Sequence, residues 1–217
     1  MIILSKILYF ISHYGFYTIV LIILLFGSLA HFTRRALFLI AIIPLAIANG
    51  FASQYLNAWF LNRYGVRSTA IITSDVETNS TLNDAYIHDY GAIVMKQNGK
   101  YINADFSTTS AAIYPIENSI QIPSKGQSFP VKYIPGFEKN IVILYYESKQ
   151  GQSRLRFERQ EPINAARIKY EADSTNNEFI EEYLKALKDY TEQYNDENTI
   201  AYQLKIIELQ RALAASK

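Results

Sequence analysis

Three side chains in one short segment, those of Asp84, His88 and Asp89, have the chemistry to bind a metal ion or to exchange protons. An imidazole with two carboxylates could ligate a divalent cation or act in general acid–base catalysis. Such a site also requires groups that orient its ligands, whereas residues 78–89 are polar and rich in turn-forming types. The sequence therefore favours a solvated loop here over a metal or catalytic site.

Known catalytic motifs are not found elsewhere in the sequence. It contains no Gly-x-Ser-x-Gly, His-Glu-x-x-His or Gly-x-x-x-x-Gly-Lys pattern. Charged residues of both signs follow the last expected strand: Glu147, Arg154, Arg156, Glu158, Arg159 and Glu161. Opposite charges such as these can pair with one another on a solvated surface, where ion pairs add little to stability. We therefore expect a surface strand or linker there. We expect a protein that is not an enzyme and that uses no metal or cofactor.

The composition argues against further classes of function. The chain has 217 residues and a formal net charge of +1, whereas nucleic-acid binding normally requires a basic patch or stripe. The absence of cysteine excludes disulfides and thiolate metal sites. The 17 tyrosines suit β-strands and also suit surfaces that contact other proteins.

Two long apolar runs, residues 7–32 and 36–60, precede all of these candidate residues in the chain. Neither run contains Asp, Glu, Lys or Arg, and each exceeds the roughly 20 residues that cross a bilayer as a helix. A helix that is apolar on all sides over such a length is rare in soluble proteins. Residues 1–62 are therefore expected to form a hairpin of two transmembrane helices in contact with the lipid bilayer.

Small and polar residues in the second run indicate how its helix packs. Ala46 and Gly50 have the spacing that allows two helices to approach closely, and Asn49 is expected to form an interhelical hydrogen bond. The orientation follows from positive residues in short loops, which favour the cytoplasm. Arg34 and Arg35 lie between the two runs, which predicts that both termini and the C-terminal domain are periplasmic. Lys6, Arg63 and Arg67 act in the opposite sense but are more widely spread.

Short alternating segments in residues 66–150 predict an antiparallel sheet or small barrel. Strands are expected at residues 68–76, 92–96, 101–106, 112–122, 129–134 and 141–146. Asn98-Gly99 lies between two of them and is a strong signal for a β-hairpin. Pro135-Gly136 predicts another turn.

Residues 160–217 have helical periodicity, which gives the whole chain an α+β class with a C-terminal helical hairpin. Thr175 and Glu178 have the spacing of a capping box before a helix with one apolar face. Asp196 can cap a last helix that carries the stripe Ile200, Leu204 and Ile207. This stripe either packs on its neighbours or binds a partner.

A protein partner would require buried aromatic or Arg anchors on the soluble domain. The candidate interaction residues are Tyr86, Tyr90, Tyr145 and Tyr146. The helix-packing residues Ala46, Asn49 and Gly50 point instead to the alternative of a structural subunit in a larger membrane complex.

Residues 65–143 resemble a family of bacterial membrane-anchored small β-domain proteins whose function is uncharacterised. The resemblance lies in Gly65 and Ala70 of the opening strand, in Asn98-Gly99-Lys100-Tyr101, and in Gly126 followed by Val131, Tyr133 and Pro135. Some proteins of this build resemble immunity proteins that neutralise an antibacterial toxin at the inner membrane. The resemblance implies no catalytic residues, and it makes a toxin the most specific partner to expect.

Overall fold

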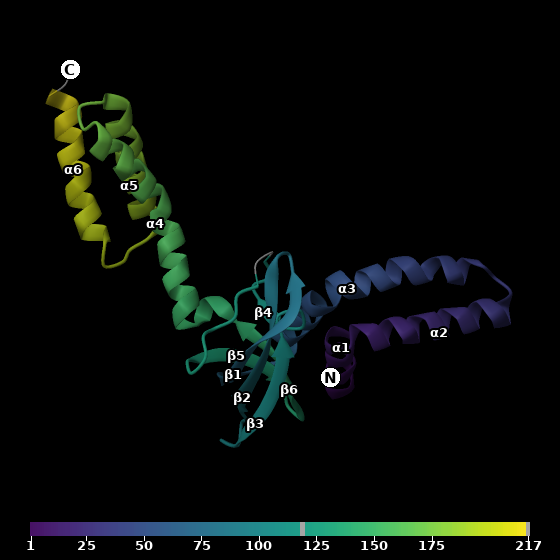
Figure 1. Ribbon diagram of the computed structural model, residues 1–217. Coiled ribbons are helices and arrows are strands. Elements are labelled where there is room, and N and C mark those ends of the chain that lie inside the picture. The colour runs from purple at the N-terminus through teal and green to yellow at the C-terminus, as the bar shows by residue number, and fades with distance from the viewer. Residues whose placement is uncertain (118–119, 216–217) are drawn as a thin grey trace. The chain divides into compact units, whose positions relative to one another are not determined.

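The computed structural model describes residues 1–117 and 120–215 (Figure 1). The chain divides into two compact units, residues 1–151 and residues 152–217. The first unit contains the apolar helices together with the β-sheet, and the second is helical.

Three helices, not two, form the N-terminal part of the chain. These are α1 (Ile2–His13), α2 (Gly15–Thr33) and α3 (Leu37–Tyr64). The prediction of one helix over residues 7–32 is wrong, because the chain breaks at Tyr14, whose φ and ψ are −120° and 52°. This break lets α1 leave α2 and bury Ser5 and Leu8, a tertiary contact that hydropathy alone does not report. Helices α2 and α3 are each long and apolar enough to cross a membrane.

The sheet is curled and mixed, with strand order β3-β2-β1-β5-β6-β4. Its strands are β1 (Val66–Leu82), β2 (Ala85–Met95), β3 (Tyr101–Ser107), β4 (Ala112–Tyr114), β5 (Ser128–Ile134) and β6 (Phe137–Leu144). All neighbours are antiparallel except β4, which pairs with β6 in parallel. A wholly antiparallel sheet is therefore wrong, because the connection between β3 and β5 carries the short β4 to the free edge of β6.

Two local predictions in the sheet had opposite outcomes. The hairpin at Asn98-Gly99 is confirmed: it joins β2 to β3, and Gly99 has φ +78°, which its missing Cβ permits. The loop predicted at residues 78–89 is wrong, since β1 and β2 continue through it to a turn at Asn83 and Asp84. The two strands pair there through their backbones. Their side chains are mostly polar, so the sequence has no apolar alternation that would indicate strands.

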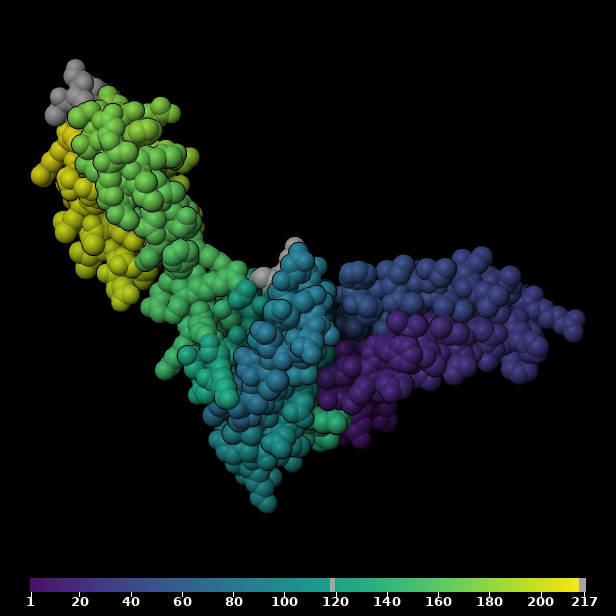
Figure 2. Space-filling model, viewed as in Figure 1, coloured from purple at the N-terminus to yellow at the C-terminus, as the bar shows by residue number. Residues whose placement is uncertain are grey.

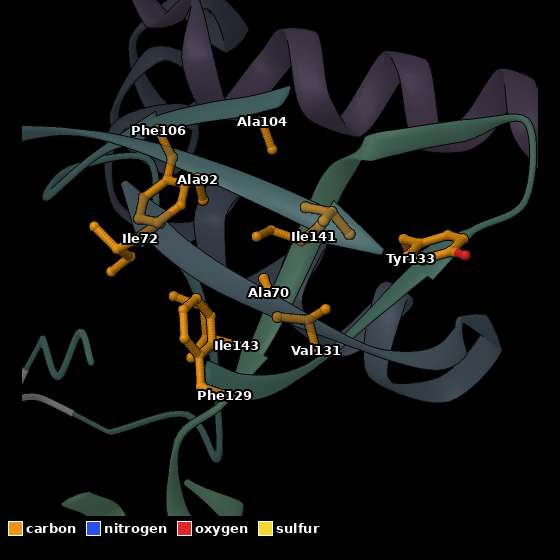
Figure 3. Packing of buried hydrophobic residues seen from close by; sticks show 12 residues of the cluster. Ala70, Ile72, Ala92, Ala104, Phe106, Phe129, Val131, Tyr133, Ile141 and Ile143 are labelled. Carbon is orange, nitrogen blue, oxygen red and sulfur yellow. The ribbon is translucent and has the colours of Figure 1, made fainter. Parts of the chain in front are cut away.

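The main core fills the inside of the curled sheet (Figure 3). Small residues such as Ala70, Ala92 and Ala104 face larger ones such as Phe129 and Tyr133, and all are nearly inaccessible to solvent. Because side chains alternate between the two faces of a strand, the odd-numbered neighbours in β2 and β3 point away from this core. Those outward residues include Asp89, Gly91 and Asp105.

A second core joins the helices to the other face of the sheet. Its members come from α1, α3, β4, β5 and β6: Leu8, Ala58, Phe60, Leu61, Ala112, Ile134, Val142 and Leu144. Beside it, Asn57 and Asn140 exchange two amide hydrogen bonds of 2.9 and 3.0 Å, and Asn140 Nδ2 also donates to Ser5 Oγ at 3.0 Å. All three residues are fully buried, so the helices and the sheet form one packed body.

The second unit consists of most of α4 (Lys149–Ala172), α5 (Asn177–Gln193) and α6 (Thr199–Ala215). The surface strand or linker predicted near Arg154 and Glu158 is wrong, because these residues lie in α4 and pair at the helical i,i+4 spacing. The cap of α5 is Asn176, one residue after the predicted Thr175, and its side chain accepts from two backbone N–H groups.

The apolar stripe predicted for the last helix points to solvent. Ile200, Leu204 and Ile207 are 72, 64 and 46% exposed, whereas Leu209 is fully buried. Both sides of α6 are apolar, so the sequence pattern did not identify the inner one. Leu209 packs with α4 and α5 residues such as Ile163 and Leu187.

Candidate binding site

A groove of about 460 Å³ lies beside the end of α1, against β1, β2 and β3. Its lining combines aromatic, acidic and small polar side chains: Tyr9, His13, Tyr14, Ser74, Val76, Asp89, Tyr90, Gly91, Asp105, Phe106, Ser107 and Ser110. Most of the strand residues in this set point away from the main core. The groove is therefore formed where the break at Tyr14 brings α1 against the outer side of the sheet.

A β-bulge forms the floor of the groove. The register of β1 against β2 shifts between Ile72 and Ser74, and the extra residue faces Gly91. Gly91 N donates to Ser74 Oγ at 3.0 Å, and Thr73 Oγ1 donates to Gly91 O at 3.1 Å. A Cβ at Gly91 would lie 2.5 Å from Ser74 Oγ, so a larger residue here would displace the Ser74 hydroxyl and break the hydrogen bond that it accepts from Gly91 N.

The wall formed by α1 carries a histidine that is neutral at physiological pH. The rings of His13 and Tyr9 stack with centroids 3.8 Å apart, and His13 Nδ1 lies 3.1 Å from Tyr9 O. Burial lowers the pKa of His13 to about 4, and the nearby Lys139 acts in the same direction. The pKa of Tyr9 is raised by burial, with smaller contributions from Tyr14 and Asp105.

The side chains that line the groove include two carboxylates and no Lys or Arg, although Lys139 Nζ lies 4.9 Å from the centroid of the Tyr9 ring. Asp89 and Asp105 are both exposed, and neither forms an ion pair within residues 1–117 and 120–215. Two carboxylates next to tyrosine rings suit the cationic side chain of a ligand, through charge-assisted hydrogen bonds and cation–π contact.

The structure does not bring Asp84, His88 and Asp89 together. Asp84 lies in the turn of the β1–β2 hairpin, and Asp89 pairs with Val76 in the register. His88 instead contacts β1, with Nδ1 2.7 Å from Asp75 Oδ1 and Nε2 3.8 Å from Glu77 Oε2. No cluster of three metal-ligating side chains occurs in the part of the chain that the structure describes.

Of the four candidate interaction tyrosines, the groove contains Tyr90. Its ring stacks between those of His88 and Phe106, at centroid distances of 6.0 and 5.5 Å. Tyr86 is exposed near the tip of the β1–β2 hairpin. Tyr145 is buried, and Tyr146 packs beside it in the 3₁₀ turn η1 (Tyr145–Glu147).

The helix-packing candidates on α3 lie in different surroundings. Asn49 is buried and donates to Gly15 O at 3.4 Å, across the start of α2. Ala46 is half-buried, and Gly50 is exposed with open space where its Cβ would be. Gly50 thus makes no close helix contact within the described chain.

Sequence reasoning missed the roles of Tyr9, His13 and Asp105. It placed the first two inside one continuous helix over residues 7–32, although Gly15 next to Tyr14 is a signal for a break. It placed Asp105 correctly in a strand but could not know that α1 lies beside it. Comparisons of the chain with family models, with curated proteins and with solved structures gave no match.

Proposed function

We propose that this chain is a membrane-anchored protein-binding module of the bacterial inner membrane. Support for the anchor comes from α2 and α3, whose most apolar windows are only 6% buried within the chain. The core helix of a soluble protein would be mostly buried, because water-exposed apolar surface of this extent is unfavourable. A bilayer supplies the missing apolar surroundings.

The proposal of protein binding rests on the groove that is lined by acidic and aromatic residues. The shared core with Asn57 and Asn140 fixes the sheet to α1 and α3, so the groove is held close to the proposed membrane surface. Its Asp89 and Asp105 carboxylates are free of ion pairs in the described chain, and Tyr90 adds an aromatic edge. The partner we propose is a protein that inserts a lysine or arginine there.

The resemblance noted above makes the proposal more specific. With Arg34 and Arg35 in the cytoplasm, the groove and the C-terminal helices are periplasmic. A protein in this place that binds without catalysing could neutralise an antibacterial toxin that acts at the inner membrane. This immunity role is the most concrete form of the proposed function.

Crosslinking from the groove tests the binding proposal. A photoreactive amino acid in place of Tyr90 should crosslink a discrete partner in native membranes, and Asp89→Lys with Asp105→Lys should abolish that adduct by repelling the cation. Glu161→Lys, a charge reversal at an exposed site on α4, should leave the adduct intact. An adduct that survives reversal of both groove charges would refute the groove as the site.

A structural subunit of a membrane complex is the second candidate, and Gly50 favours it. Small residues on a helix allow close approach of another helix, and the space at the Gly50 Cβ position is open. Gly50→Leu should then dissociate complexes that are stable to mild detergent, whereas Leu45→Ile should not. If crosslinked complexes persist in the Gly50 variant, this face of α3 does not hold the complex together.

A further inference from the structure

A second groove lies between α1 and α2, and its lining is apolar where that of the groove beside the sheet is acidic and aromatic. It has a volume of about 490 Å³ and is lined by Ile3, Lys6, Ile7, Phe10, Ile11, Thr18, Leu21, Ile22 and Leu25. Seven of these nine side chains are hydrocarbon or aromatic, and Lys6 is the charged one. Figure 2 shows the atoms of α1 and α2 in purple.

Helix α1 has apolar residues on both sides, and only one side is packed. Ser5 and Leu8 are buried against the rest of the unit. Ile3, Ile7 and Phe10 are 75, 48 and 36% exposed, at spacings that put them on one face. A helix with a packed side and an exposed apolar side fits the boundary between a protein domain and lipid.

Two lysines gather at this end of the unit without an acidic partner. Lys6 Nζ lies 5.7 Å from the centroid of the Phe137 ring, and Lys139 Nζ lies 5.3 Å from the same centroid. Neither forms an ion pair within residues 1–117 and 120–215. Lys6 is therefore a cation without an ion pair on the lining of the apolar groove, and Lys139 lies near it at the Phe137 ring and 4.9 Å from the Tyr9 ring centroid.

We infer that the groove between α1 and α2 binds an anionic phospholipid, with an acyl chain along Ile7 and Leu21 and the phosphate at Lys6 and Lys139. The inference rests on the proposed membrane anchor. The groove is continuous with α2, whose exposed apolar surface would face the same bilayer. The apolar side chains of the lining suit the acyl chain of such a lipid, and the two lysines without ion pairs suit its phosphate.

Retention of lipid by the purified full chain tests the inference. Native mass spectrometry in detergent would compare phosphatidylglycerol with zwitterionic phosphatidylcholine of the same chain lengths. We expect preferential retention of phosphatidylglycerol, reduced roughly tenfold in Lys6→Ala with Lys139→Ala. Lys100→Ala with Lys125→Ala, which removes two exposed lysines from turns, should retain it as the wild type does.

A matched pair on α2 tests the groove itself. Leu21 lines this groove and Leu24 does not, although both are more than half exposed. Leu21→Gln should weaken retention, and Leu24→Gln should not. Equal retention of both lipids by the wild type, or equal effects of the two glutamines, would overturn the inference. If the chain still sediments with membranes in that case, the anchor stands; if it is found in the aqueous fraction, both proposals fail.

Discussion

At the scale of single residues, His13 shows how a break in a helix changes the chemistry of a side chain. Inside one long apolar helix it would be an isolated histidine facing lipid or another helix. The break at Tyr14 instead places it against the sheet, stacked on Tyr9 and close to the backbone of Asp105. Burial there favours the neutral imidazole, so His13 contributes shape and hydrogen bonding to the groove, and no charge.

This burial predicts a pH dependence of stability. The unfolded chain binds a proton at His13 below a pKa of about 6.5, whereas the folded chain does so only below about 4. Because the unfolded state binds more protons between these values, stability falls as the pH drops from about 7 to 4, by about 3 kcal/mol at most. Thermal unfolding of the full chain in detergent across this range measures the effect.

The histidine variants identify the source of that slope. His13→Gln should flatten the fall in melting temperature on acidification, because glutamine does not titrate. His31→Gln alters an exposed histidine at the end of α2 and should leave the slope unchanged. An undiminished slope in the His13 variant would show that other groups cause it.

At the scale of elements, the polar contact between Asn57 and Asn140 fixes the angle between the helices and the sheet. Apolar packing alone would allow the helices to slide along the sheet. The two reciprocal hydrogen bonds between the Asn57 and Asn140 amides, and the hydrogen bond to Ser5, require one register of α1, α3 and β6. Their full burial makes each unmatched group costly, since water cannot replace the lost partner.

We predict that replacing one of the two asparagines lowers the free energy of unfolding more than replacing both. Asn140→Leu leaves Asn57 and Ser5 unpaired and should lower the free energy of unfolding by about 2–3 kcal/mol. Adding Asn57→Leu should recover part of that loss, which denaturant unfolding in a double-mutant cycle would reveal. Asn103→Leu on β3, at an exposed site, should have little effect. Additive losses would contradict the reciprocal bond.

The same scale explains which elements the sequence could predict. The Asn98-Gly99 hairpin was found because its signal is local turn chemistry. The break at Tyr14 was missed because its one local signal, Gly15, is also tolerated inside a helix. The polar ends of β1 and β2 were missed because backbone pairing between the strands forms them, without an apolar pattern. The sequence pointed to Asp89 and Tyr90 of the candidate site but not to Tyr9 and Asp105. These two are 96 positions apart, and no local pattern connects them.

At the scale of the whole molecule, the two units differ in how they depend on the proposed membrane helices. The second core of the sheet needs Leu8, Phe60 and Leu61 from α1 and α3. The core of the helical unit draws all its members from residues 163–213. The helices of the first unit are therefore part of its fold and not a detachable anchor.

This difference predicts opposite behaviour of two fragments. Residues 152–217 alone should be helical and melt cooperatively, because their core is complete. Residues 66–151 alone should lack a cooperative transition, because Ile134, Val142 and Leu144 would be exposed on the uncovered face of the sheet. Circular dichroism during heating distinguishes the two outcomes.

Substitutions within the helical fragment test whether its melting reflects the packed core. Leu187 is fully buried, and Leu187→Ala should destabilise the fragment by about 3 kcal/mol through loss of contacts and the cavity left behind. Leu204 is 64% exposed on α6, so Leu204→Ala should change the melting temperature little. If residues 66–151 folded cooperatively by themselves, or if both leucine variants melted alike, the division of the core between the units would be wrong.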